Sequence, residues 1–274
     1  MIIFDPVTVE AARQGSRAAL EELINAASGP VFNLAMRMLA HRQDAEDATQ
    51  EILIKIITHL GDLREMELAG AWAFRIASRH LAKTARLGRV EKMRWGFTEY
   101  AADLEHGQAD PAHLDLTDAE HQLALKEVKV GCTLAMLVCL SRPLRIAYIL
   151  GDIFEMTDTE ACDILEIPAG TYRQRLRRAR NSITNFMQST CSIHSAAATC
   201  SCARRITPAL QTRRIAKGIT GLNADQIGTL APKDVQRNVA NLETAQRSVA
   251  ILRSNPRFVP SMTALVEQIL HQFP

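Results

Sequence analysis

The sequence predicts an all-α protein. Apolar residues recur at the three- and four-residue spacing of amphipathic helices, and no strand-like alternation or Asn-Gly hairpin turn occurs in the N-terminal half. The composition is 47% hydrophobic but only 5% aromatic, which suits helices with aliphatic cores. At 274 residues the chain exceeds the usual size of a single domain, so we expect several helical units joined by linkers.

The first expected unit covers residues 1–88. Amphipathic helices are predicted from Thr8 to Leu60, broken at Gly29-Pro30 and Gly61-Asp62, and a further helix over residues 70–87. The apolar stripes are Val31, Leu34, Ala35, Met38 and Leu39, then Ala45, Ala48, Ile52, Ile56 and Leu60.

An acidic linker is predicted over residues 89–117. No Lys or Arg lies between Phe97 and Glu120, and Gly96, Gly107 and Pro111 interrupt the helical periodicity. The acidic residues from Phe97 to Glu120 are Glu99, Asp103, Glu105, Asp110, Asp115, Asp118 and Glu120.

Residues 118–187 are expected to form a second helical unit containing a helix-turn-helix over residues 157–180. Ala161, Ile164, Leu165 and Ile167 would pack its two helices together, leaving the N-terminal face of the second helix free to enter a DNA groove. The candidate residues for base edges and phosphates are Thr171, Tyr172, Arg173, Gln174 and Arg175, and those mainly for phosphates are Arg177, Arg178 and Arg180. The alternative is a solvated basic face on an ordinary surface helix.

A Cys/His segment follows at residues 188–203, and a helical extension is expected over residues 204–274. Cys191, His194, Cys200 and Cys202 are four candidate ligands for zinc or copper, with a redox switch or incidental cysteines as alternatives. Cys132, Cys139 and Cys162 lie at apolar helix positions and are expected in the core. The extension carries one apolar stripe, Val235, Val239, Leu242, Val249 and Leu252, and a final helix from Ser261 to Leu270.

Several classes of protein are excluded by what the sequence lacks. It has no P-loop, no Gly-rich dinucleotide turn, no H-E-x-x-H and no nucleophile elbow, so we expect a protein that is not an enzyme and requires no cofactor. No secretion signal or membrane-spanning run is recognised, so a cytoplasmic protein without membrane insertion is expected. The net charge of +2 is too small to indicate DNA binding by itself, so the charge distribution carries that argument.

From Leu137 to Arg180 the sequence resembles the promoter-reading domain of extracytoplasmic-function sigma factors. The family pattern is matched at Ile167, Pro168, Gly170, Thr171, Arg175, Leu176, Arg178, Ala179 and Arg180. Glu166 departs from it, because the family commonly has glycine at this turn. A left-handed conformation there would cost a non-glycine residue about 1 kcal/mol, so we expect the local geometry to differ from that of the family.

The N-terminal unit resembles the first conserved domain of the same family, from about Ala18 to Arg86. The similarity includes residues 44–51 and 72–77. It implies polymerase contacts at Asp44, Asp47, Gln50, Glu51 and Lys55, with a solvated helix face as the alternative. It implies DNA contacts on the following helix, at Arg75, Arg79, His80, Lys83 and Arg86. Trp72 lies on the same helix, but an aromatic residue at helical spacing is more often a core residue. The resemblance also implies that the loop of residues 61–69 captures a promoter base.

The resemblance implies a bacterial sigma factor built from two helical sigma-type domains. Such a protein binds core RNA polymerase and promoter DNA, directs transcription initiation at the nucleoid, and can be held by an anti-sigma factor. The acidic linker is expected either to occupy a cationic channel of the polymerase or to act as a spacer. The extension is expected to modulate activity, or to sense metal or redox state. The alternatives for the whole chain are a stand-alone helix-turn-helix regulator and a sigma-like decoy without promoter activity.

Overall fold

The computed structural model describes residues 2–83, 88–110, 116–212, 214–215, 231–240, 242–260 and 269. Every regular element in these ranges is helical, as predicted. The first elements are α1 (Pro6–Arg13), α2 (Arg17–Leu39), α3 (Arg42–Thr58), η1 (Leu60–Asp62), η2 (Met66–Leu68), α4 (Ala69–Lys83), η3 (Glu91–Met93) and α5 (Phe97–His106). They are followed by α6 (Asp118–Cys139), α7 (Arg142–Tyr148), the π-helical turn η5 (Ile149–Ile153), α8 (Asp158–Leu165), α9 (Ala169–Thr190), α10 (Cys202–Gln211), α11 (Pro232–Val239) and α12 (Thr244–Arg253).

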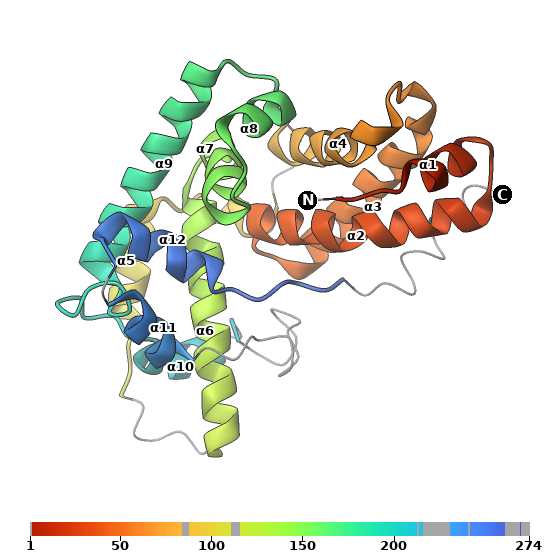
Figure 1. The fold of residues 1–274 in the computed structure, drawn as a ribbon. Helices are drawn as coiled ribbons and strands as arrows, with labels where there is room; N and C mark the ends of the chain where they lie inside the picture. The colour runs from red at the N-terminus through yellow and green to blue at the C-terminus, as the bar shows by residue number, and fades with distance from the viewer. Residues whose placement is uncertain are drawn as a thin grey trace.

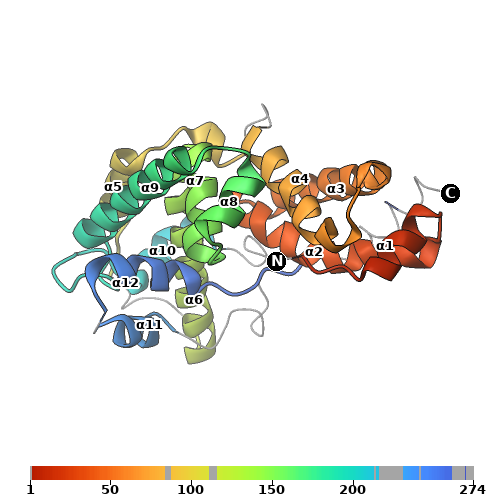
Figure 2. The same ribbon diagram turned by 45° about the horizontal axis from the view of Figure 1, so that its top comes forward.

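Helices α1 to α4 form an N-terminal lobe, drawn in red to orange in Figures 1 and 2. The long helix α2 is at its centre and packs against α1, α3 and α4. The predicted apolar stripes are buried between these helices, except that Ala48 is only partly covered. The spacing of apolar residues therefore located this core correctly.

One predicted helix break is wrong. Pro30 lies inside α2, which continues past it to Leu39. The Ser28 hydroxyl donates to the Asn25 carbonyl (3.0 Å), and the Asn33 amide donates to the Gly29 carbonyl (2.9 Å). Side chains thus bind carbonyl groups around the proline, and burial of the flanking apolar residues favours an unbroken helix.

Helices α6 to α9 form the next lobe, which is green in Figure 1. Capping boxes begin two of them, at Thr117 for α6 and at Thr157 for α8, because each threonine is followed three residues later by a glutamate. Helix α8 packs on α9, and the two are joined by a short turn from Glu166 to Pro168. This helix pair lies where the sequence predicts the helix-turn-helix.

The acidic segment is not the irregular linker that we expected. It contains α5, whose Tyr100 and Leu104 are buried one turn apart while most of its acidic side chains stay at the surface. Tyr100 stacks between Trp95 and Phe186 of α9, with ring centroids 6.4 and 5.5 Å away. In the sequence, the charges and glycines of this segment obscure the helical spacing of Tyr100 and Leu104.

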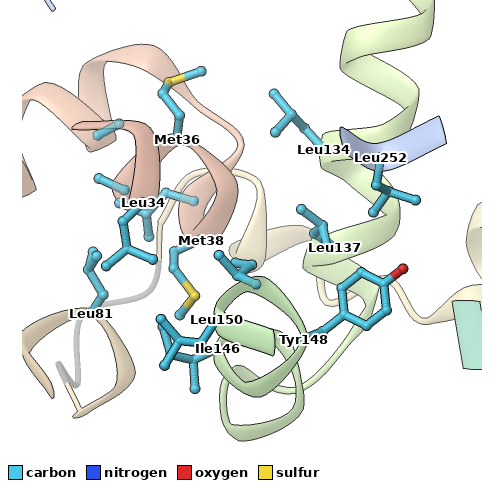
Figure 3. Close-up of a cluster of buried hydrophobic side chains, with 14 of the residues drawn as sticks. Leu34, Met36, Met38, Leu81, Leu134, Leu137, Ile146, Tyr148, Leu150 and Leu252 are labelled. Atoms are coloured by element: carbon cyan, nitrogen blue, oxygen red, sulfur yellow. The ribbon is translucent and has the colours of Figure 1, made fainter. Parts of the chain in front are cut away.

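A continuous buried core joins the lobes. Figure 3 shows Met36 and Met38 of α2 near Leu134 and Leu137 of α6, with Leu252 of α12 beside them. The two helical units predicted from the sequence therefore pack directly against each other in this structure.

The C-terminal extension crosses both lobes. Helix α10 packs on α6, and α12 packs on α9 and η5. Beyond α12 the chain reaches α2, where the Asn33 side chain donates to the Phe258 carbonyl (2.6 Å) and accepts from the Phe258 N–H (2.8 Å). The predicted final helix, from Ser261 to Leu270, lies outside the described residues except for position 269.

Candidate nucleic-acid interface

Helix α9 has one buried stripe and one basic outer face. The buried residues are Tyr172, Leu176, Ala179, Ile183, Phe186 and Met187. The residues on the outer face, exposed or half-buried, are Thr171, Arg173, Gln174, Arg175, Arg177 and Arg178. Guanidinium and amide groups projecting from the first turns of such a helix can reach both base edges and phosphates.

Two residues predicted to contact DNA make contacts within the protein instead. Tyr172 is fully buried and its hydroxyl donates to the Ala147 carbonyl (3.5 Å), so its assignment to the DNA face is wrong. Burial raises the pKa of this phenol. Arg180 donates through Nε and a terminal nitrogen to the carboxylate of Asp152 at 2.6 to 3.1 Å, so this pair holds α9 to η5. Helical spacing explains the first error, because Tyr172 lies four residues before the buried Leu176.

The turn before α9 is left-handed even though it lacks the family's glycine, so the expected difference in local geometry is wrong. Glu166 has φ 51° and ψ 51°, in the left-handed region, and its N–H donates to the Cys162 carbonyl. The Glu166 carboxylate then meets α4, lying 2.7 Å from a terminal nitrogen of Arg79 and 4.0 Å from one of Arg75. The sequence singles out each of these three residues separately, Glu166 because it replaces the family's glycine, but it does not indicate their contact.

The basic residues of α4 have different surroundings. Arg75 and Arg79 are half-exposed on one face, and Lys83 is exposed at the end of the helix. His80 does not belong to this face, because its ring lies between Lys55 Nζ (2.7 Å) and Glu51 (3.3 Å) of α3. Burial and the charge of Lys55 lower the pKa of His80, with Glu51 opposing the shift.

The remaining residues predicted in this part of the chain are placed as follows. Arg86 lies outside the described residues. Trp72 is half-buried against the core, which fits the alternative expectation for it. Residues 62–65 and Leu68 of the loop before α4 line a cavity of about 390 Å³, together with Trp72 and Arg75 of α4 and with Glu160, Asp163 and Ile164 of α8. The loop predicted to capture a base is therefore closed on one side by α8.

The predicted polymerase contacts lie along α3. Asp44 is largely buried and its carboxylate accepts a hydrogen bond from the N–H of Arg89 (2.5 Å), so it holds the start of α3 to the segment that follows α4. Asp47 and Gln50 are half-buried, while Glu51 and Lys55 are exposed. The outer part of this face remains open for a partner, whereas Asp44 has a structural role.

The predicted metal ligands do not form a common site. In the part of the chain that the structure describes, no group of three or more His, Cys, Asp or Glu side chains is placed to hold a metal ion. The Nε2 atom of His194 instead lies 3.0 Å from the Thr244 carbonyl and 3.1 Å from the Ser248 hydroxyl, which ties the segment to α12. The Cys/His set therefore does not fit a four-ligand centre.

The cysteines of this segment gather near α6. Cys191 and Cys200 form a backbone bridge, and Cys202 begins α10, which packs on α6. Cys132 of α6 accepts a hydrogen bond from the Tyr100 hydroxyl (3.0 Å). Burial raises the pKa of Cys132 to about 12 and that of Cys200 to about 11, and nearby thiols add to both shifts. Cys132, Cys139 and Cys162 were expected in the core, but they are only half-buried and pack against it.

None of the helices in the described ranges combines the length and the hydropathy that a membrane span requires.

Comparison with known proteins identifies the class. Residues 23–87 match the model of sigma-70 region 2, and this range contains α3 and α4. The chain is 27% identical over 186 residues to the RNA polymerase sigma-H factor of Pseudomonas aeruginosa, a match covering 67% of this chain and 94% of the relative. By these matches, the chain is an RNA polymerase sigma factor.

Two further relatives narrow the class. The extracytoplasmic-function (ECF) sigma-E factor of Escherichia coli is 26% identical over 184 residues, covering 67% of this chain and 94% of the relative. The ECF factor SigE of Mycolicibacterium smegmatis is 26% identical over 178 residues, covering 63% and 64%. The chain is a sigma factor of the extracytoplasmic-function type, with a role in transcription initiation.

Proposed function

We propose that this sigma factor reads promoter DNA with the outer face of α9 and holds the opened strand with α4. The main support is the division of α9 into a fully buried apolar stripe and an outer face bearing Arg173, Gln174, Arg177 and Arg178. Arginine and glutamine suit guanine and adenine edges, and the more distal arginines suit phosphates. Catalysis belongs to the polymerase.

The partner surface on α3 is narrower than the sequence alone indicates. Asp47, Gln50, Glu51 and Lys55 are the residues of this set that a polymerase subunit can reach, whereas Asp44 is largely covered. We expect Asp47→Lys to weaken binding to core RNA polymerase because it reverses a charge on this surface. The same variant should leave the thermal stability nearly unchanged, since Asp47 is not a core residue.

The DNA assignment is tested with holoenzyme reconstituted from core polymerase and single variants. Arg178→Ala should weaken binding to all promoters alike and lower the slope of log affinity against log salt by about 1, because a phosphate contact is lost. Gln174→Ala should instead change the preference for one base pair, worth about 1–3 kcal/mol. Arg237→Ala on α11 is a matched control, because Arg237 is exposed and its partner Asp234 lies on the same helix.

A stand-alone regulator gives a different result in this experiment. It would bind a specific site tightly without polymerase, and its variants would show the same losses in the presence and absence of core enzyme. Promoter binding that depends on core enzyme supports the sigma assignment.

We propose that the extension regulates access to these surfaces. Its contacts reach both lobes and the acidic segment: α10 packs on α6, Arg205 of α10 donates to the carbonyls of Asp103 (2.9 Å) and Gly107 (2.5 Å), and Phe258 pairs with Asn33 of α2. A tethered segment acts at high effective concentration, so even weak contacts can compete with an external partner.

The test removes residues 256–274, which leaves α12 in the shared core but ends the contact with Asn33. The expected result is a change in core affinity or in transcription. Unchanged values of both would contradict a regulatory role for this part of the extension. The same proposal implies that the protein acts in the cytoplasm with polymerase at the nucleoid, and that a separate anti-sigma factor can hold it. The alternative role for the extension is to sense metal or redox state.

A further inference from the structure

The contact between α4 and the turn before α9 joins two elements that are both expected to bind DNA. Arg75 and Arg79 lie one helical turn apart on α4, so their guanidinium groups share a face. The Glu166 carboxylate lies against this face, at 2.7 Å from Arg79 and 4.0 Å from Arg75. An anionic oxygen at hydrogen-bond distance from an arginine is the arrangement that a DNA phosphate would adopt there.

The backbone directs Glu166 toward α4. The left-handed conformation at this residue ends α8, and it is unfavourable for any residue with a β-carbon. Glycine would adopt the same turn more easily but would place no charge on α4. The glutamate therefore gives this turn a carboxylate at the cost of a less favourable backbone.

Further contacts keep α8 on α4. Helix α4 packs along α8, and Phe74 meets Phe154 edge to face with ring centroids 5.9 Å apart. From the other side, Arg253 of α12 donates to the Asp152 carbonyl and pairs with Glu155 at 2.7 Å, which holds the segment leading into α8. The extension thus supports the element that covers α4.

We propose that Glu166 is an internal substitute for a DNA phosphate, which masks the strand-holding face of α4 in the free protein. The contact is autoinhibitory, because nucleic acid binds α4 only after the α8–α9 turn has moved away from it. The turn has to move when α4 and α9 bind separate segments of the promoter. The inference rests on the proposed role of Arg75 and Arg79 as DNA contacts.

The test measures binding of a fluorescently labelled single-stranded DNA, 20 nucleotides long, to the full-length protein without polymerase. Fluorescence anisotropy at low salt should show that Glu166→Gln binds about two- to fivefold more tightly than the wild type, the range for a half-exposed ion pair. The gain should shrink as salt screens the pair. Glu166→Gly, which restores the family's residue, should act in the same direction.

Glu105→Gln is the matched control, because it removes one carboxylate from the exposed surface of α5 and should not change the affinity. Equal affinities of Glu166→Gln and wild type, or a gain of the same size in Glu105→Gln, would overturn the proposal. Absence of measurable binding by Glu166→Gln would overturn it as well. Melting curves of the variants check that each is folded.

A parallel assay separates this inference from the proposed function. Arg79→Ala is compared with wild type in transcription by reconstituted holoenzyme. If Arg79→Ala lowers transcription while Glu166→Gln binds DNA like the wild type, the masking contact is refuted and the DNA role of Arg79 remains. If Arg79→Ala also leaves transcription unchanged, the assignment of α4 to DNA fails too.

Discussion

Replacing Glu91 by glutamine should destabilise the whole protein, because this carboxylate and its partner Arg145 together join four segments of the chain. Glu91 is 9% exposed and accepts hydrogen bonds from Arg142 (2.6 and 2.9 Å), from Arg145 (2.9 Å) and from the Gly88 N–H (2.9 Å). Arg145 also donates to the carbonyls of Met38, Leu137, Val138 and Leu140. The buried ion pairs thus connect residues 88–91 with α7, α2 and the end of α6.

The pKa of Glu91 sets the size of the effect. Burial by itself raises this pKa, but hydrogen bonds from Arg142 and Gly88 and the charge of Arg145 outweigh it and lower the pKa from 4.5 to about 2. Such a shift corresponds to about 3 kcal/mol of folding free energy at neutral pH, which agrees with the cost of breaking a buried ion pair. Because the folded-state pKa is depressed, this stability is present above pH 4.5 and is lost as the pH falls toward 2.

Urea unfolding at several pH values measures the effect. Glu91→Gln should lower the free energy of unfolding by about 3 kcal/mol at pH 7, and less than half of the difference should remain near pH 3. Glu105→Gln, on the exposed side of α5, should change it by less than about 0.5 kcal/mol. A loss below about 1 kcal/mol at pH 7, or a loss that does not depend on pH, would refute the reasoning.

Three further predictions concern Arg253 of the extension, His194 and the cysteines Cys132 and Cys200. Arg253→Ala should cost about 1 kcal/mol and speed proteolytic cleavage near α12, because its bonds to Asp152 and Glu155 are lost; unchanged cleavage would contradict this role. His194→Ala should lower stability by about 1–2 kcal/mol in urea without altering zinc or copper content measured by elemental analysis, since the ring binds Thr244 and Ser248; loss of bound metal would refute it. Burial raises the pKa of Cys132 to about 12 and that of Cys200 to about 11, so both thiols should react slowly with a thiol reagent at pH 8 until the protein unfolds. The stability that the buried neutral thiols contribute should be present below pH 9 and lost as the pH rises through 11 to 12.

Local patterns in the sequence predicted most of the helices. The stripe from Val31 to Leu39 and the apolar positions Ala161, Ile164 and Leu165 repeat within a few residues, so they can be read directly from the chain. Pro30 and α5 were predicted wrongly because packing against distant helices outweighs a local helix-breaking signal.

The candidate site was predictable in part. The arginines of α9 were identified from their spacing, and the same spacing should have placed Tyr172 on the buried stripe with Leu176. The contact of Glu166 with Arg79 joins residues 87 positions apart, and no local pattern specifies such a pair. Likewise, the role of His194 depends on α12, fifty residues further along the chain.

The most direct test of the central claim is transcription by purified core RNA polymerase on a library of genomic fragments, with and without this protein, followed by mapping of the transcript start sites. A sigma factor of the extracytoplasmic-function type should produce new start sites that share an upstream element, and Gln174→Ala should alter that element. Stable binding to core enzyme without any new start site, in the wild type and in the variant that lacks residues 256–274, would contradict the account.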